Sequence, residues 1–249
     1  MIKYFLGLLM IALVSCQNSE KKLSSEEIVD KAIAYSGKSK LNNTILKFDF
    51  RKYHYKATPT CDGFKFERIS KSKPIRDVLV NDELTRYSND SIVKLADSTA
   101  FSYYESVNSV HYFTQLPVRL KDEAVNLSDL GKEKIQDKTY HKIEVKFSEN
   151  GGGVDFEDIY IYWFDVEDFS MDYLAYSFIV NEGGLRFRKA INRRTIEGVV
   201  FQDYENYKPR IKSKDLEGLA EMFENNELEL LSVIENKNIE LTPVELNCR

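Results

Sequence analysis

Histidine and cysteine are both scarce in this chain, which has only three of each among its 249 residues. The histidines, His54, His111 and His141, are far apart in the sequence and fall on an expected strand, helix and strand. A zinc site would need their side chains to converge. Nothing in their spacing predicts this, so we expect no metal site.

Catalytic motifs are also missing. No Ser-His-Asp or Cys-His arrangement stands out by its spacing, and carboxylates are too numerous to single out a glycosidase pair. The acidic residues between positions 155 and 172 offer oxygen ligands for calcium, but they lack EF-hand spacing and are more simply a solvated turn. We expect a protein that is not an enzyme and that has no cofactor.

Positive charge is not concentrated anywhere along the chain. Lysine and arginine number 35 against 40 aspartates and glutamates, which gives a formal net charge of −5. An acidic protein without a basic stretch gains nothing from counterion release on DNA. Nucleic acid is therefore excluded as an expected partner.

Long hydrophobic runs are absent except at the N-terminus. The apolar run at residues 4–14 follows Lys3 and is shorter than the roughly 20 residues that span a bilayer. It fits a secretory signal, and its ending, Leu13-Val14-Ser15-Cys16, resembles the bacterial lipobox. An ordinary signal peptide that happens to end in a cysteine is the alternative.

The lipobox resemblance implies a lipoprotein. Residues 1–15 would be a lipoprotein signal peptide, Cys16 would carry the lipid, and residues 16–23 would form a tether to a single domain at residues 24–249. Acyl chains on Cys16 would hold the protein at a membrane. Gln17 follows the cysteine and no acid-rich tract comes after it, so we expect the outer membrane, on its periplasmic side.

Alternating apolar residues are abundant, most clearly at residues 158–207, which predict four consecutive antiparallel strands. The first of these strands, residues 158–164, is apolar on both faces and should be covered on both sides. Further strands are expected at residues 44–55, within 78–95, and within 228–244. A mainly β protein follows.

Local signals also predict three helices. Ser24 and Glu27 form a capping box, and Gly37 ends the first helix. Asp97 is the expected N-cap of a helix over residues 96–113, and Asp215 begins a short third helix.

Cys61 and Cys248 remain once Cys16 is assigned to the lipid. In an oxidising compartment such a pair is typical of a disulfide. Two free thiols are the alternative. Separately, Asp90-Ser91-Ile92 resembles an O-glycosylation motif of Bacteroidota placed in a turn.

Some of these residues carry a family resemblance. The segment Tyr162-Trp163-Phe164-Asp165, followed by a turn into Tyr173-Leu174, resembles the LolA/LolB-like lipoprotein carriers and receptors. Together with Ile161, Asp172-Tyr173-Leu174-Ala175-Tyr176 and Asn192-Arg193-Arg194 before Glu197-Gly198, it also resembles an uncharacterised family of Bacteroidota outer-membrane lipoproteins with that fold.

The resemblance implies an α+β, mainly β fold in which a curved antiparallel sheet, an incomplete β-barrel, has helices covering its concave face. It also implies a monomer with a cavity for an acyl chain, a lipid or a lipoprotein. The expected cavity residues are Phe48, Phe50, Ile159, Ile161, Trp163, Leu174, Tyr176 and Phe178. The alternative is a structural or interaction lipoprotein whose core is filled by its own side chains and which docks an envelope partner.

Overall fold

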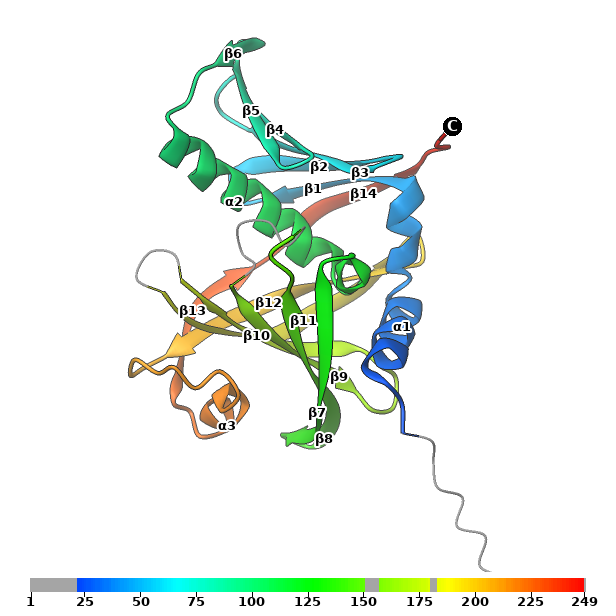
Figure 1. Ribbon diagram of the computed structural model, residues 1–249, viewed down its shortest axis with the longest axis vertical. Coiled ribbons are helices and arrows are strands. Elements are labelled where there is room, and N and C mark those ends of the chain that lie inside the picture. The colour runs from blue at the N-terminus through cyan, green and yellow to red at the C-terminus, as the bar shows by residue number, and fades with distance from the viewer. Residues whose placement is uncertain (1–21, 151–156, 180–182, 249) are drawn as a thin grey trace, which may run out of the picture.

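The computed structural model describes residues 22–150, 157–179 and 183–248. The expected signal peptide, Cys16, most of the expected tether and the glycines at 151–153 lie outside the described residues. Within that part of the chain the strands form two seven-stranded antiparallel sheets, shown in Figure 1. Sheet A contains, in spatial order, β14 (Lys237–Pro243), β1 (Thr44–Phe50), β2 (Tyr53–Thr60), β3 (Gly63–Ser70), β4 (Ile75–Val80), β5 (Glu83–Ser88) and β6 (Ser91–Val93).

Sheet B contains the four strands predicted at residues 158–207, flanked by strands from before and after them. Its spatial order is β13 (Leu228–Ile234), β12 (Val199–Pro209), β11 (Gly184–Ile196), β10 (Met171–Phe178), β9 (Ile159–Asp165), β8 (Lys138–Phe147) and β7 (Val125–Ile135). The chain passes from sheet B to sheet A between β13 and β14. The mainly β fold class is confirmed, with the strands divided between two sheets.

Helix α1 (Ser25–Ser36) begins and ends where local chemistry predicts. The Ser24 N–H donates to Glu27 Oε2 (2.9 Å) and the Glu27 N–H donates to Ser24 Oγ (3.2 Å), which is a complete capping box. Gly37 ends the helix with a φ of 63°. A Cβ on Gly37 would lie 2.2 Å from the Gly198 carbonyl oxygen, so both conformation and space require glycine there.

Helix α2 (Asp97–Gln115) lies between the two sheets (Figure 1). Its N-cap is Ala96, so Asp97 is the first helical residue and not the cap that the sequence suggested. Tyr104 and Val107 pack against sheet A, whereas Tyr112 and Phe113 pack against sheet B. One helix therefore packs against both sheets.

The remaining helices cover edges and faces of these layers. The short 3-10 helices η1 (Lys38–Asn43) and η2 (Val118–Lys121) follow α1 and α2, and α3 (Leu219–Glu224) packs on sheet B. Figure 1 shows α3 on the side of sheet B that faces away from α2. Sheet B is thus covered on both faces.

Strand β9 explains why sheet B needs two covers. Tyr160, Tyr162 and Phe164 belong to the cluster under α1 and α2. Ile161 and Trp163, on the other face, pack with Leu219 and Ala220 at α3. All five side chains are at most 6% exposed, as expected for a strand that is apolar on both faces.

Candidate functional site

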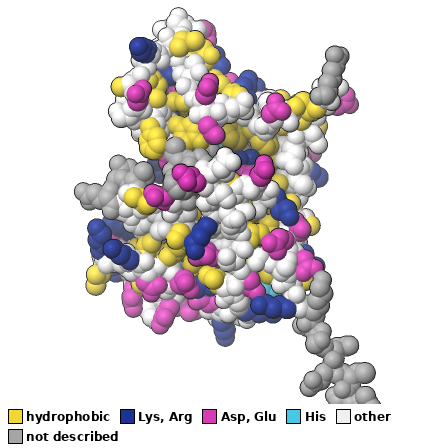
Figure 2. Space-filling view, in the orientation of Figure 1, with side chains coloured by type: hydrophobic (Ala, Val, Ile, Leu, Met, Phe, Trp, Pro, Cys, Tyr) yellow, Lys and Arg dark blue, Asp and Glu magenta, His cyan; other side chains and the backbone are white. Residues whose placement is uncertain are grey.

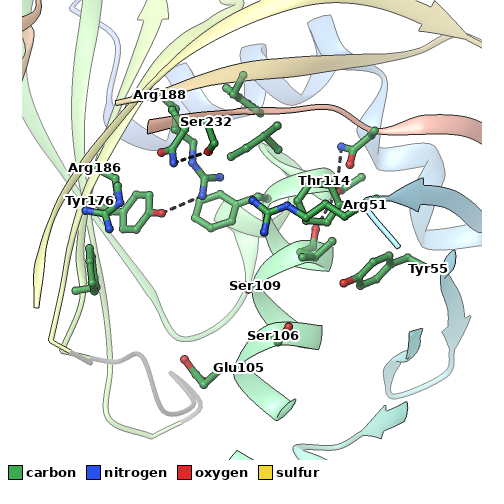
Figure 3. A pocket seen from close by; sticks show the side chains of 18 of the residues that line it. Arg51, Tyr55, Glu105, Ser106, Ser109, Thr114, Tyr176, Arg186, Arg188 and Ser232 are labelled. Atoms are coloured by element: carbon green, nitrogen blue, oxygen red, sulfur yellow. Dashed lines mark hydrogen bonds between the residues drawn. The ribbon is translucent and has the colours of Figure 1, made fainter. Parts of the chain in front are cut away.

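A pocket of about 750 Å³ lies between the two sheets, beside α2. It is lined by residues from the β1–β2 turn, from α2, and from β9 to β13. Segments from most of the length of the chain therefore contribute to it. Figure 2 shows hydrophobic side chains gathered on the sheet A half of the molecule, above its junction with the lower half. Figure 3 shows the pocket from close by.

Aromatic rings form much of the pocket wall. Phe113 of α2 lies 5.4 Å from Tyr176 of β10, between ring centroids, and Tyr176 stacks at the same distance on Tyr160 of β9. Phe50 and Tyr55 contribute further rings from sheet A. Such a surface offers large apolar contact area with hydroxyl groups at a few points.

The tyrosine hydroxyls of this region stay protonated. Burial raises the pKa of Tyr204 to about 12 and raises the pKa of Tyr112 and of Tyr162 above the usual value. Tyr112 and Tyr162 bond to each other through their hydroxyls at 2.9 Å. These groups therefore act as neutral donors and acceptors and not as bases.

Arg188 is the most deeply buried cation of the pocket lining. It is 7% exposed. It lies in β11, and its side chain projects among the aromatic side chains of the pocket wall. Its guanidinium carbon lies 3.8 Å from the Phe113 ring centroid, and its Nη2 donates to the Tyr176 hydroxyl at 2.9 Å (Figure 3). Arg188 Nε is buried and has no hydrogen-bond partner within the described residues.

Polar side chains next to Arg188 continue across sheet B. Asn206 of β12 is level with Arg188 in the strand register, and its Nδ2 donates to Ser232 Oγ at 3.3 Å. Its Oδ1 is buried and finds no partner in the part of the chain that the structure describes. This part of the pocket is therefore polar and incompletely satisfied by the protein itself.

Other charged residues of the lining lie further from this point. Arg51 and Lys52 come from the exposed β1–β2 turn, and Arg186 lies two residues before Arg188 on β11. The lining carboxylates are Glu105 of α2 and Asp158, just before β9. In Figure 3 Arg51 extends from the sheet A side toward the middle of the pocket, and Glu105 lies further along α2.

The structure separates the eight expected cavity residues. Phe50, Tyr176 and Phe178 line the pocket, and the other five do not. Phe48 packs in the core of sheet A, Leu174 packs under α1, and Ile159 is partly buried beside Ser177. Ile161 and Trp163 lie on the α3 face of sheet B.

A β-bulge accounts for this separation. Continuing the pairing Met171↔Phe164 without a break would place Leu174 opposite Ile161, on one face. The register instead shifts between Met171 and Tyr173, so Leu174 pairs with Tyr162. Because of this one extra residue, Leu174 and Tyr176 share a face of the sheet with Tyr162 and Tyr160 and not with Ile161 and Ile159.

Sequence reasoning missed Arg188, Phe113 and Tyr160 as lining residues. Tyr160 follows from the bulge, because it pairs with Tyr176. Arg188 alternates with Leu185 and Phe187 along β11 and lies on the opposite face from them, where Phe113 of α2 packs on it. A helix from elsewhere in the chain leaves no signal in a strand pattern.

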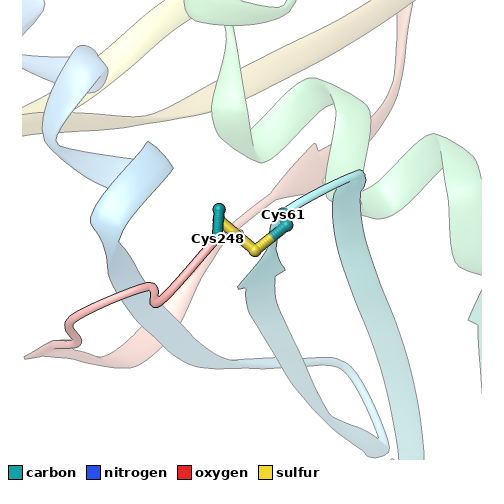
Figure 4. Close-up of a disulfide and its surroundings, with 2 residues drawn as sticks. All are labelled: Cys61 and Cys248. Atoms are coloured by element: carbon teal, nitrogen blue, oxygen red, sulfur yellow. A yellow bond between two sulfur atoms is a disulfide. The ribbon is translucent and has the colours of Figure 1, made fainter.

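Cys61 and Cys248 form a disulfide in the structure, with an S–S distance of 2.05 Å (Figure 4). It joins the β2–β3 turn to the segment that follows β14, across a sequence separation of 187 residues. The expected lipidation site, Cys16, lies outside the described residues.

Metal and membrane-spanning features can be stated only for the described residues. In those ranges no group of three or more His, Cys, Asp or Glu side chains is placed to hold a metal ion. Over the same ranges, no helix has the length and apolar character needed to cross a membrane.

Several solved structures are similar to this one at low identity. A LolA superfamily protein from Nitrosomonas europaea has a TM-score of 0.49 and 10% identity, covering 90% of this chain and 96% of its own. A DUF1329 family protein from Desulfovibrio piger has a TM-score of 0.49 and 8% identity, covering 87% and 92%. The Mycobacterium tuberculosis lipoprotein LppX has a TM-score of 0.26 and 11% identity, covering 64% and 91%.

Sequence comparison places the chain in a family without a known function. No curated protein matches the sequence. The model of a family of unknown function, DUF6503, matches residues 2–236, which is most of the chain. The chain belongs to the DUF6503 family.

Proposed function

We propose that this protein is an envelope lipoprotein that binds a lipophilic ligand, an acyl chain, a lipid or a lipoprotein, without catalysing a reaction. The pocket between the sheets carries this proposal. Its volume of about 750 Å³ falls within the range of ligand sites, roughly 300–1,000 Å³. Aromatic walls with a few convergent polar groups are also typical of such sites.

The placement of the pocket supports binding over a purely structural role. Each sheet has an apolar cluster packed by helices, and the pocket lies between the two clusters beside α2, with residues of both clusters in its wall. Side chains of the described residues therefore line this space without filling it. A ligand with apolar groups would bury the exposed parts of Phe113, Tyr176 and Phe178.

The N-terminal sequence supports the anchored location. We infer that residues 1–15 are a lipoprotein signal peptide, that Cys16 is lipidated, and that residues 16–23 tether one domain, residues 24–249, as a monomer at the periplasmic side of a Bacteroidota outer membrane. The lipobox ending and the Bacteroidota lipoprotein resemblance at residues 161–165 support this.

Pocket binding is tested with a neutral apolar fluorophore, N-phenylnaphthylamine, and the neutral competitor dodecanol. Ser109 of α2 lines the pocket, and a Ser109→Trp substitution would fill it. We expect affinity for both molecules to fall at least about tenfold. Ser102→Trp places the same side chain on an exposed position of α2 outside the pocket and should leave affinity unchanged. Equal binding by both variants would contradict the proposal.

The anchor is tested separately with a Cys16→Ser variant in cells fed an alkyne-tagged fatty acid. Wild-type protein should acquire the tag and sediment with membranes, and the variant should do neither, because the acylated thiol is lost. A wild-type protein that is secreted without the tag would contradict the lipoprotein assignment and leave the pocket proposal standing.

A further inference from the structure

We propose that the ligand of this pocket is an amphiphile with an anionic head group, and that Arg188 binds that head group while the apolar tail contacts the aromatic wall. This rests on the proposed function, since it names the class of ligand that the same pocket would take. The shared chemistry is a single anionic oxygen group on an apolar chain, which a carboxylate or a phosphate monoester both provide.

Arg188 is a buried charge that has no counterion among the described residues. It is 7% exposed, and within the described residues no carboxylate oxygen lies at salt-bridge distance from its guanidinium. Arginine remains charged at physiological pH. Buried charges in proteins are ordinarily paired with an opposite charge, so this site is electrostatically complete only with an anion beside it.

The contacts of Arg188 also orient its guanidinium group. The Phe113 ring lies over the guanidinium and Tyr176 accepts from Nη2, which together fix the plane of the group. Nε remains without a partner. A planar guanidinium presents its N–H groups as a fork that suits carboxylate and phosphate oxygens.

The two lining carboxylates lie away from Arg188 along their own elements. Glu105 precedes Phe113 by eight residues on α2, which is about 12 Å along the helix axis. In the strand register, Arg188 of β11 is level with Leu174 of β10, which is level with Tyr162 of β9. Asp158 comes four residues before Tyr162, and β9 is two strands away from β11. Neither group neutralises the guanidinium at contact distance.

The surroundings of Arg188 add to the local positive potential. Arg186 lies on the same strand and Arg51 and Lys52 on the facing turn, all in the pocket lining. The protein as a whole has a formal net charge of −5, which repels anions in general. A preference for an anionic ligand would therefore arise from the pocket and not from overall charge.

The test compares three competitors that share one chain: dodecanol, laurate and dodecyl phosphate. Each displaces N-phenylnaphthylamine from the wild-type protein at a pH near 8 and below its micelle concentration. We expect laurate, dodecyl phosphate or both to displace the probe at a concentration at least about tenfold lower than dodecanol. The better of the two anions identifies the head group as carboxylate or phosphate.

The variant Arg188→Met keeps the length and apolar character of the side chain and removes its charge. The anion preference, taken as the ratio of the dodecanol and anion concentrations that displace the probe from this variant, should fall to about one. Arg188→Lys, which retains a charge, should keep part of the preference and also serves if Arg188→Met does not fold. Lys189→Met removes a charge from the neighbouring residue, outside the pocket, and should keep the full preference.

The outcomes separate the two proposals. Displacement by all three competitors at equal concentration would overturn the anionic head group and leave lipophilic binding intact. An anion preference that survives in Arg188→Met would overturn the role of Arg188. If the probe, dodecanol and both anions all fail to bind, the proposed function and this inference are overturned together.

Discussion

Each sheet buries an arginine on the face that looks toward α2, but the two guanidinium groups have different surroundings. In sheet A, Arg68 of β3 donates from Nε and Nη2 to Asp77 Oδ2 at 2.9 and 2.6 Å, and Asp77 also accepts from Arg86. In sheet B, Arg188 contacts the Tyr176 hydroxyl and the rings of Phe113 and Tyr176, and among the described residues no carboxylate pairs with it. The protein therefore satisfies one buried cation internally and leaves the other open to a pocket.

This difference indicates separate roles for the two sheets. A buried ion pair with two hydrogen bonds to one carboxylate oxygen fixes the relative positions of β3 and β4, and Ser106 of α2 accepts a further bond from Arg68 at 2.5 Å. Breaking such a pair is costly because it strands a buried charge. A cation that already lacks a carboxylate contributes little to that rigidity and is available to an external anion.

The largest expected effect is at Asp77, which is fully buried. Asp77→Asn would leave Arg68 and Arg86 without their shared carboxylate, and we expect the free energy of unfolding to fall by about 3–5 kcal/mol. Urea unfolding measures this fall in the free energy of unfolding. Asp90→Asn is a matched control on an exposed turn residue with a φ of 60°, where the change should stay within about 0.5 kcal/mol. Equal effects would contradict the assignment of Asp77 as the anchor.

The disulfide of sheet A should have the next largest effect. Replacing Cys61 and Cys248 by serine releases the segment after β14 from the β2–β3 turn. Removing a link across so long a segment should lower the free energy of unfolding by about 2–4 kcal/mol. Adding a reductant to the wild type should reproduce the loss, and the double variant should not respond to it. A wild type whose stability is insensitive to reductant would contradict a bonded pair.

His111 gives sheet A a pH dependence. It stacks on Phe66 with ring centroids 4.3 Å apart, and its burial lowers its pKa from 6.5 to about 3. Folded His111 thus stays neutral at pH 5, whereas the unfolded chain binds a proton there. Because the unfolded state binds more protons, the free energy of unfolding falls as the pH drops below about 6.5, by about 2 kcal/mol at pH 5.

A His111→Phe variant isolates this contribution. It should lose about 2 kcal/mol less stability than the wild type between pH 8 and pH 5, measured by urea unfolding at both values. The weak contact of His111 Nε2 with the Glu67 carbonyl oxygen, at 3.3 Å, is lost at both pH values and cancels in the comparison. Parallel losses in the two proteins would show that the buried histidine does not titrate on unfolding.

Local chemistry allowed much of the fold to be predicted. Ser24, Glu27 and Gly37 fix α1 to within a residue, because caps depend only on neighbouring backbone groups. Period-two alternation located all four strands of residues 158–207. The division of strands between two sheets depends on contacts between distant segments, and no local pattern reports it.

The pocket was harder to predict than the strands that build it. The bulge between Met171 and Tyr173 reverses the facing of Leu174 against Ile161, and a bulge of one residue has no clear sequence signal. The burial of Arg188 depends on Phe113, which lies 75 residues earlier in the sequence. The alternation of charged and apolar residues along β11 does not show which helix covers either face.

The smallest expected effect on stability is at Arg188 itself, and it tests the comparison most sharply. Arg188→Met removes a cation that no described carboxylate pairs with and loses one hydrogen bond to Tyr176. We expect the free energy of unfolding to stay within about 1 kcal/mol of the wild type. Arg68→Met makes the same chemical change in sheet A and should cost about 2–3 kcal/mol, since Asp77 then keeps only Arg86.

Urea unfolding of the two variants side by side measures this difference. Equal losses would show that both arginines hold their sheets in the same way, and the contrast between them would disappear. A loss confined to Arg68→Met, with the anion preference abolished only in Arg188→Met, would assign stability to one buried arginine and ligand recognition to the other. The two measurements are independent, because stability is read without ligand and the preference is a ratio of affinities within one variant.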